Sequence, residues 1–264
     1  MKDKMLITDL DKSLLRNDLT ISEYTVSIFE KCRNSGYVIV IATARPFSAA
    51  SEFIDIIKPD GVVLHNGAIV MVNNEIIKQH GIDSVKVKQI VKKIEEKYPE
   101  ATISAVTNNE MYTNFDFPAG FPFAKIDFSQ FPNCEANIII VGAVPLEQIK
   151  TIDEYVTQDL YLEINNGMFG FIMNKNASKW LGIKELAEYF GIDIRNTIAF
   201  GDDMNDLTMI KNCGKGICMK NGLDEVKAIA DDICDENEND GIAKWLEENI
   251  LQLPLKPVFF KPIL

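Results

Sequence analysis

The chain has few of the residues that build disulfide frameworks, zinc sites or histidine-based metal centres. Its 264 residues include five cysteines and two histidines. The cysteines form no CxxC pair and their number is odd, so neither a disulfide framework nor a cysteine zinc site is predicted. We interpret most of them as small buried hydrophobic residues. His65 and His80 are too few for a histidine-based metal site, and we interpret both as structural or surface residues.

The sequence also lacks a long apolar run and an excess of positive charge. No stretch reaches the roughly 18 apolar residues of a membrane span, and the N-terminal segment has no apolar region of the kind found in secretion signals. The formal net charge is -12, so no overall basic field attracts nucleic acid or anionic lipid. We therefore expect a cytoplasmic, reduced protein that binds neither nucleic acid nor membrane.

Strand and helix patterns alternate in two parts of the chain, and a different pattern separates these parts. Up to about residue 80, and again after residue 176, apolar runs typical of buried strands alternate with helical stretches. Asn73 and Asn74 supply the turn of a predicted hairpin. Residues 82–175 mix hairpins with helices. The sequence therefore predicts one α/β core, formed by residues 1–81 and 176–264, that is interrupted by an α+β module.

One segment of the inserted module has an unusual composition. Residues 115–133 contain six phenylalanines and three prolines, and the prolines disfavour regular structure. Two interpretations stay open. The segment is either a loop that faces the substrate or a loop that packs on its own aromatic side chains.

Polar residues close or flank four of the apolar runs in the predicted core. The clusters are Asp9 and Asp11 after Met5–Ile7, Thr43 in VIVIATARP, Lys179 in NASKWLGI, and Asp202 and Asp206 in TIAFGDDMNDL. Open α/β sheets bind their ligands at the carboxyl ends of their parallel strands. If these segments share one sheet, the clusters converge on one point. Several carboxylates, one cation and one hydroxyl group suit phosphoryl transfer through a metal ion.

The chemical difficulty of phosphate-ester hydrolysis is largely one of charge. Enzymes must accelerate the slowest of these reactions by up to roughly 10²¹-fold. A carboxylate that attacks a phosphate dianion at about 4 Å meets a repulsion of roughly 8 kcal/mol at an effective dielectric constant near 20. A divalent cation and a lysine can cancel that repulsion. Mg²⁺ prefers oxygen ligands, and Asp9 and Asp202 are the best candidates to bind it directly.

The residues of the first two clusters suit different steps of this reaction. We predict that Asp9 is the nucleophile and forms an aspartyl-phosphate intermediate. Asp11 can protonate the leaving oxygen and then take a proton from the hydrolytic water. The hydroxyl of Thr43 and backbone N–H groups just after the first strand, that of Leu10 among them, can bind the phosphoryl oxygens. Asn205 could do the same with its amide.

The remaining candidates act around the phosphate. Lys179 can bind it, and Asp206 is predicted to orient the Lys179 ammonium by an ion pair. Ala44 and Arg45 follow Thr43 and are candidates for substrate contact; pairing of Arg45 with a surface acid is an equally good interpretation. Asp203 is interpreted as a solvated loop acid.

Each cluster also has an ordinary structural explanation. A DxD pair at the end of a strand is often a turn or a helix cap, and so is a segment such as GDDMND. A threonine after an apolar strand is usually structural, and a lysine at the start of a helix is usually solvated. The occurrence of all four clusters in one order is what favours a catalytic site.

That ordered set resembles a known family. DLDKS, ATARP, the downstream lysine in ASKW, and GDDMNDLTMI are similar to the four signature motifs of the haloacid dehalogenase superfamily. LHNGA, MKNGLDEVKAIADDI and ENDGIAKWL resemble its Cof-type phosphatase branch. The similarity covers roughly residues 4–80 and 176–247. It implies a Rossmann-like core with a mainly parallel sheet, an α+β cap inserted at residues 82–175 that determines substrate specificity, and Mg²⁺-dependent hydrolysis of phosphorylated metabolites.

The resemblance also implies roles position by position. Asp9 matches the nucleophile of the family, Asp11 its acid/base, Thr43 and Lys179 its phosphate-binding residues, and Asp202 its metal ligand. In such proteins the backbone carbonyl of the residue at Asp11 completes the metal shell. The implied metal site is therefore Asp9, Asp11 and Asp202.

Three positions depart from the pattern of this branch. Lys12 stands where glycine is usual, Ser13 where threonine is usual, and Ala44 where glycine is common. If position 12 requires a positive φ, Lys12 strains the loop, because it lacks the backbone freedom of glycine. Ser13 keeps the hydroxyl. We expect activity to survive, because every charged or hydroxyl-bearing role is still filled.

Three functions are compatible with these residues. The leading hypothesis is a phosphatase that acts on small phosphorylated metabolites, with sugar phosphates as the first expectation. A phosphomutase, which returns the phosphoryl group to the sugar, is the second. The third is a non-enzymatic regulatory module in which Asp9 is phosphorylated without turnover. The inserted module and the acid at Asp11 argue against the third.

Overall fold

The strands form two sheets in a computed structural model that describes residues 3–108, 110–116, 122–165 and 167–251. The larger sheet has the strand order β14-β13-β12-β1-β2-β3-β4-β5, and the smaller has the order β10-β11-β9-β6-β7-β8. The chain folds into two compact units. The first comprises the described residues of Met1–Ile41, Phe53–Pro59 and Phe190–Leu264, and the second those of Ala42–Glu52 and Asp60–Tyr189.

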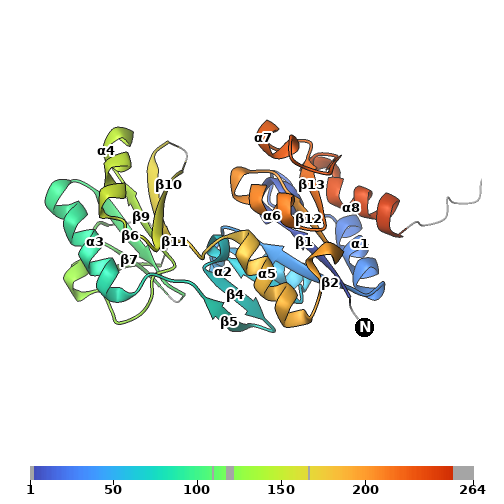
Figure 1. Cartoon of the computed structure of the whole chain (residues 1–264), viewed down its shortest axis with the longest axis horizontal. Coiled ribbons are helices and arrows are strands. Elements are labelled where there is room, and N and C mark those ends of the chain that lie inside the picture. The colour runs from blue at the N-terminus through green and yellow to red at the C-terminus, as the bar shows by residue number, and fades with distance from the viewer. Residues whose placement is uncertain (1–2, 109, 117–121, 166, 252–264) are drawn as a thin grey trace, which may run out of the picture. The chain divides into compact units, whose positions relative to one another are not determined.

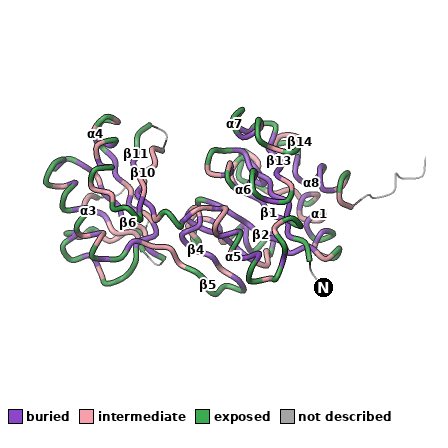
Figure 2. Tube along the Cα trace, viewed as in Figure 1, coloured by how far each residue is buried: buried purple, intermediate pink, exposed green. Residues whose placement is uncertain are grey.

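A parallel array of buried strands forms the centre of the first unit. Its strands are β1 (Lys4–Thr8), β2 (Tyr37–Ala42), β12 (Thr197–Gly201), β13 (Lys215–Met219) and β14 (Asp232–Cys234), and every neighbouring pair is parallel. Every residue of β2 is buried, and so are the last four of β1 (Figure 2). Strands that are covered on both faces have continuous apolar sequences, which explains the runs MLIT and YVIVIA.

Helices cover this array. They are α1 (Glu23–Asn34), α6 (Leu207–Asn212), α7 (Asp224–Lys227) and α8 (Gly241–Leu246). The Ser22 side chain caps α1 by accepting a hydrogen bond from the Thr25 N–H at 3.0 Å. Helices α1 and α8 pack side by side (Figure 1), and Trp245 of α8 meets Phe200 of β12 edge to face at 5.4 Å between ring centroids. The apolar faces of these helices therefore close the core.

The second unit contains an antiparallel part of the larger sheet. Its strands are β3 (Gly61–Leu64), β4 (Ile69–Val72) and β5 (Glu75–Gln79). Asn73 and Asn74, with φ of 51° and 63°, form the turn between β4 and β5, as predicted. Helix α2 (Phe47–Ile57) precedes β3 in the chain, and α5 (Lys179–Phe190) packs closely on β3 through Gly182.

The second unit also contains the smaller sheet. Its strands are β6 (Thr102–Val106), β7 (Met111–Thr113), β8 (Ala124–Lys125), β9 (Ile138–Gly142), β10 (Leu160–Asn165) and β11 (Phe169–Asn174). Helices α3 (Ser84–Lys97) and α4 (Leu146–Thr151) pack on it (Figure 1). Apolar residues of α3, among them Val87 and Ile94, share one buried cluster with Ile103, Ile139 and Ile172 of the sheet. The predicted mixture of hairpins and helices is confirmed.

The described part of the phenylalanine-rich segment packs on aromatic side chains. Phe128 and Phe131 are buried in the same cluster, and their rings stack at 6.1 Å between centroids. Tyr112 meets Phe131 edge to face at 5.3 Å. For this part, the interpretation of a loop packed on its own aromatics is correct. Residues 117–121 lie outside the described residues.

Short turns connect the elements, and two elements differ from expectation. The 3₁₀ or π turns are Leu10–Leu14, His65–Gly67, Phe128–Gln130, Ile152–Tyr155, Ile194–Asn196, Met204–Asp206, Asn237–Asn239 and Glu247–Leu251. Strand β14 was not predicted, and the phrase LDEVKAIA, whose pattern favours a helix over residues 223–230, forms only the four-residue helix α7. Among the described residues, no helix has the length and apolar character needed to cross a membrane.

Candidate active site

The first candidate residue, Asp9, comes directly after β1. Thr8 pairs in register with Phe200 of β12, and the Asp9 N–H donates to the Phe200 carbonyl at 3.0 Å. This bond fixes the backbone of Asp9 against the neighbouring strand. Asp9 is only 5% exposed, so its carboxylate is largely removed from water at the carboxyl end of the parallel array.

Strand β12 delivers the next acids through a tight turn. Asp202 follows β12, and the turn Met204–Asp206 folds the chain back. The Oδ2 atom of Asp206 accepts hydrogen bonds from the N–H groups of Asp202 at 3.0 Å and Asp203 at 3.2 Å. A Cβ on Gly201 would lie 2.6 Å from Cβ of Asp206. Glycine at position 201 is therefore what leaves room for the Asp206 side chain.

Three carboxylates lie together as a result. Carboxylate oxygens of Asp9, Asp202 and Asp206 are all within 4.8 Å of one another, and all three residues are buried. At this separation two unit charges repel by about 3.5 kcal/mol at an effective dielectric constant near 20. Oxygen ligands are those that Mg²⁺ and other hard cations prefer. The donor set and its crowded negative charge therefore fit a divalent cation.

The loop between β1 and α1 contributes a further contact to this cluster. The Ser13 hydroxyl donates to Oδ1 of Asp202 at 3.0 Å, which orients that carboxylate. Leu10 is buried and Asp11 is half-buried in the same loop. Lys12 has φ of 57° and ψ of 6°, which is the left-handed region that favours glycine. The condition of the prediction for Lys12, a positive φ, is therefore met.

A buried cysteine lies next to the acids. Burial raises the pKa of the Cys218 thiol to about 11, and the carboxylates of Asp202 and Asp206 raise it further, whereas Lys227 acts in the opposite direction. Cys218 is therefore a neutral thiol at pH 7 and does not compete with Asp9 as a nucleophile. Cys32, Cys213 and Cys234 are also buried, as predicted for most of the cysteines.

The second motif lies in the second unit and forms a closed turn. Thr43 is fully buried, its N–H donates to the Val63 carbonyl at 2.9 Å, and its hydroxyl accepts from the Arg45 N–H at 3.2 Å. The Arg45 guanidinium donates to the Ala49 carbonyl at 2.9 Å, at the start of α2. Ala44 is exposed at the tip. These bonds hold the segment after β2 in one conformation.

Lys179 is the first residue of α5 and is also in the second unit. It is 1% exposed, which is rare for a lysine. A Cβ on Gly67, which has φ of 104°, would lie 2.2 Å from the Ser178 carbonyl oxygen. Only glycine allows this approach, so the phrases LHNGA and NASKW pack directly on each other. The start of α5, and with it Lys179, is fixed by that contact.

The two histidines have structural contacts, as interpreted from the sequence. His80 lies 2.8 Å from Glu185 Oε1, and His65 is buried in the turn after β3. Burial lowers the pKa of His65 to about 4, well below the roughly 6.5 of an unfolded chain. His65 is therefore neutral at pH 7, and the folded protein resists its protonation.

His65 should make the protein less stable in acid. Because its folded pKa is depressed, the associated stability is present above pH 6.5 and is lost as the pH falls towards 4. We expect the wild type to lose roughly 2 kcal/mol more unfolding free energy than His65→Asn between pH 7 and pH 5. Urea unfolding at both pH values measures this difference. An equal loss in both proteins would show that His65 is not the titrating group.

The structure thus groups some of the predicted site residues and adds others. Asp9 and Asp202 lie together in the first unit, and Asp206, which was predicted only as a partner of Lys179, joins them. Asn205 is half-buried in the same turn, and the exposed Asp203 accepts from the Met204 N–H. The sequence feature that could have placed Asp206 beside Asp202 is the spacing of four residues between them across a turn.

The chain is similar to known phosphatases over almost its whole length. The model of the haloacid dehalogenase-like hydrolase family matches residues 6–246. The phosphatase YitU of Bacillus subtilis, named for 5-amino-6-(5-phospho-D-ribitylamino)uracil, is 28% identical over 94% of this chain and 97% of its own. YcsE of the same organism, with the same named substrate, is 25% identical over 94% and 96%.

Solved structures show the same fold. The sugar phosphatase BT4131, of HAD subclass IIB, has a TM-score of 0.78 and 25% identity, and covers 93% of this chain and 98% of its own. BT1666 from Bacteroides thetaiotaomicron has a TM-score of 0.81 at 24% identity, with 93% of this chain and 94% of its own covered. This second likeness concerns the fold alone.

The chain belongs to the haloacid dehalogenase-like hydrolase family. It is a phosphoric monoester hydrolase, as predicted. The predicted α/β fold, with a Rossmann-like core and an additional α+β part, is confirmed by the two sheets and by the solved relatives.

Proposed function

We propose that the protein is a Mg²⁺-dependent phosphatase of small phosphorylated metabolites and that it acts through an aspartyl-phosphate at Asp9. The observation that carries this proposal is the buried cluster of Asp9, Asp202 and Asp206 at the carboxyl ends of β1 and β12. In the part of the chain that the structure describes, it is the one group of His, Cys, Asp and Glu side chains close enough to hold a metal ion. The three acids would hold Mg²⁺, which when bound supplies positive charge beside the phosphate.

The reaction divides between the two acids of the first motif. A carboxylate oxygen of Asp9 attacks phosphorus, and the bond from phosphorus to the leaving oxygen breaks while Asp11 gives that oxygen a proton. A water molecule then attacks the phosphorus of the aspartyl-phosphate. Asp11 takes the proton from this water, inorganic phosphate leaves, and the Asp9 carboxylate is restored. Ser13 keeps Asp202 oriented through both steps.

The roles proposed for the remaining residues rest on their sequence motifs. Thr43, Lys179, Asn205 and the backbone N–H of Leu10 would bind phosphoryl oxygens, and Ala44 and Arg45 would contact substrate. The carbonyl of Asp11 would join the metal ligands, while Asp206 would also pair with Lys179. The domain boundaries at residues 82 and 176, the cytoplasmic location and the absence of a nucleic-acid partner also stay predictions.

For the substrate we propose a phosphate ester on a sugar or sugar-alcohol chain. The named substrate of YitU and YcsE carries its phosphate on a ribityl chain, and BT4131 is named a sugar phosphatase. Both kinds of molecule present a phosphate monoester on a polyhydroxylated carbon chain. This shared group is what supports the substrate class.

A release assay tests the proposal. Purified protein with Mg²⁺ is incubated with sugar phosphates, sugar-alcohol phosphates, nucleotides and phosphorylated cofactors, and free phosphate is measured. We expect multiple turnovers that are fastest on the first two classes. Activity on phosphoproteins but on no small phosphate would contradict the substrate class. Isomerised sugar phosphate without released phosphate would indicate a phosphomutase, and a stable phosphoprotein without turnover would indicate a regulatory module.

A further inference from the structure

Two C-terminal sequence phrases have structural contacts that catalysis alone does not explain. MKNGLDEVKAIADDI contains Asn221, ENDGIAKWL contains Asp240, and Asn237 comes directly before the second phrase. All three side chains bind residues 10–17, which follow Asp9 and which we call the nucleophile loop. These contacts join segments of the first unit that are more than 200 residues apart in the sequence.

Two asparagines connect the backbone carbonyls of the nucleophile loop. Nδ2 of Asn221 donates to the Lys12 carbonyl at 2.7 Å. Oδ1 of Asn221 accepts from the Asn237 N–H at 3.1 Å, and Nδ2 of Asn237 donates to the Leu15 carbonyl at 2.9 Å. The chain of bonds therefore starts at Lys12, passes through both side-chain amides and ends at Leu15. Asn237 is 5% exposed, so its bonds are protected from water.

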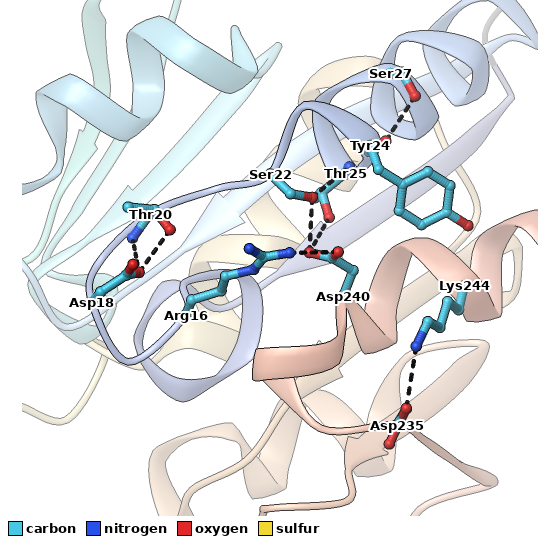
Figure 3. A network of polar contacts seen from close by, with 10 residues as sticks. All are labelled: Arg16, Asp18, Thr20, Ser22, Tyr24, Thr25, Ser27, Asp235, Asp240 and Lys244. Carbon is cyan, nitrogen blue, oxygen red and sulfur yellow. Dashed lines mark hydrogen bonds and ion pairs between the residues drawn. The ribbon is translucent and has the colours of Figure 1, made fainter.

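A third contact anchors the end of the loop. Figure 3 shows the Asp240 carboxylate accepting hydrogen bonds from Arg16 at 2.7 Å, Ser22 at 2.8 Å and Thr25 at 3.2 Å. Ser22 caps α1 and Thr25 lies in its first turn. Asp240 thus ties the exit of the nucleophile loop to the start of α1. The loop is held at its turn and at its exit by residues of the C-terminal segment.

The bond to Lys12 lies at the strained position. Lys12 occupies the left-handed region, where its Cβ is unfavourable, so the loop needs contacts that favour this conformation. Its carbonyl belongs to the peptide that leads into Ser13, and the Ser13 hydroxyl orients Asp202. On the other side of Lys12 is Asp11. A change in the Lys12 conformation would therefore move both Ser13, which orients Asp202, and Asp11, the proposed acid/base.

We propose that Asn221 and Asn237 are positioning residues, which hold the carbonyls of Lys12 and Leu15 and thereby keep the nucleophile loop in its reactive conformation. The proposal rests on the proposed role of Asp9 and Asp11. Asn221 acts mainly by offsetting the unfavourable left-handed conformation of Lys12. The need for Asn221 should accordingly be smaller when residue 12 is glycine.

A double-mutant cycle of N221A and K12G tests this. We expect N221A to lower kcat by roughly 10- to 100-fold and to change KM by less than about threefold, because the loop shapes the transition state rather than ground-state binding. K12G in the N221A background should restore most of kcat, because glycine adopts a positive φ without strain. N212A, which removes an asparagine bond to the Thr208 carbonyl in α6, is the matched control and should keep kcat within about twofold.

The wild type, N221A, K12G and the double variant are also compared by urea unfolding, a measurement that does not depend on activity. We expect N221A to raise the unfolding equilibrium constant severalfold with K12G and by no more than that with Lys12 present, because a strained loop that loses its bond can relax. Equal effects of N221A on kcat with and without K12G would overturn the proposal, and so would an unchanged kcat or an unchanged unfolding equilibrium constant in N221A. If N221A does not fold, N221D replaces it, because aspartate keeps the acceptor for the Asn237 N–H. An active Asp9→Asn protein would refute the nucleophile and leave the unfolding cycle intact.

Discussion

Asp9→Asn is expected to lower kcat for phosphate release by at least about 10⁴-fold. The amide has nearly the shape of the carboxylate, but it cannot attack phosphorus or form the aspartyl-phosphate. The N–H of residue 9 still donates to Phe200, so the fold should be retained. Initial rates of phosphate release measure the loss of kcat, and urea unfolding measures whether the fold is retained.

A neighbouring acid provides the control for this substitution. Asp203 lies beside Asp202 but is exposed, and its side chain caps the turn at Met204. Asparagine is an equally good cap, so Asp203→Asn should keep kcat within about twofold. Near wild-type rates in Asp9→Asn would refute the nucleophile. Equal losses in both variants would show that any change of charge at this end of the sheet disturbs the enzyme.

Removal of divalent cations is expected to abolish turnover and to lower the stability of the protein. Three buried carboxylates within 4.8 Å repel one another, and a bound cation relieves this repulsion. At a Mg²⁺ concentration of one hundred times the dissociation constant, binding should add about 2.7 kcal/mol to the unfolding free energy. Chelation followed by Mg²⁺ titration, read by thermal unfolding and by phosphate release, measures both effects.

Asp202→Asn separates metal binding from other causes of inactivation. It removes one negative charge from the cluster, so without metal it should be more stable than the metal-free wild type. It should also lose most of the stabilisation by Mg²⁺, whereas Asp203→Asn should keep it. A chelator-resistant activity, or an undiminished Mg²⁺ effect in Asp202→Asn, would contradict the assignment of this cluster as the metal site.

The family, the α/β fold and the acids that follow β1 and β12 could be predicted from the sequence. Buried parallel strands have uninterrupted apolar sequences, so their ends are visible, and Asp9 and Asp202 follow those ends directly. The positive φ of Lys12 was anticipated as a condition, because similar sequences usually have glycine at this position. These features depend on local sequence, which is why they could be recognised.

Other features depend on contacts that local sequence does not show. Strand β14 has three residues, begins with an acid and exposes half of Ile233, so no apolar run marks it. The position of Asp206 depends on the tight packing at Gly201. Asn221 and Asn237 look like ordinary turn residues, and only the folded chain brings them to the nucleophile loop.

Chemical trapping of the phosphorylated residue tests the central claim most directly. The enzyme is mixed with its best substrate, quenched in acid during steady-state turnover and treated with borohydride, which reduces an aspartyl-phosphate to homoserine. Peptide mass spectrometry then locates the change. We predict homoserine at Asp9 in the wild type and none in Asp9→Asn. Homoserine at another aspartate, or none in a protein that is turning over substrate, would contradict phosphoryl transfer through Asp9.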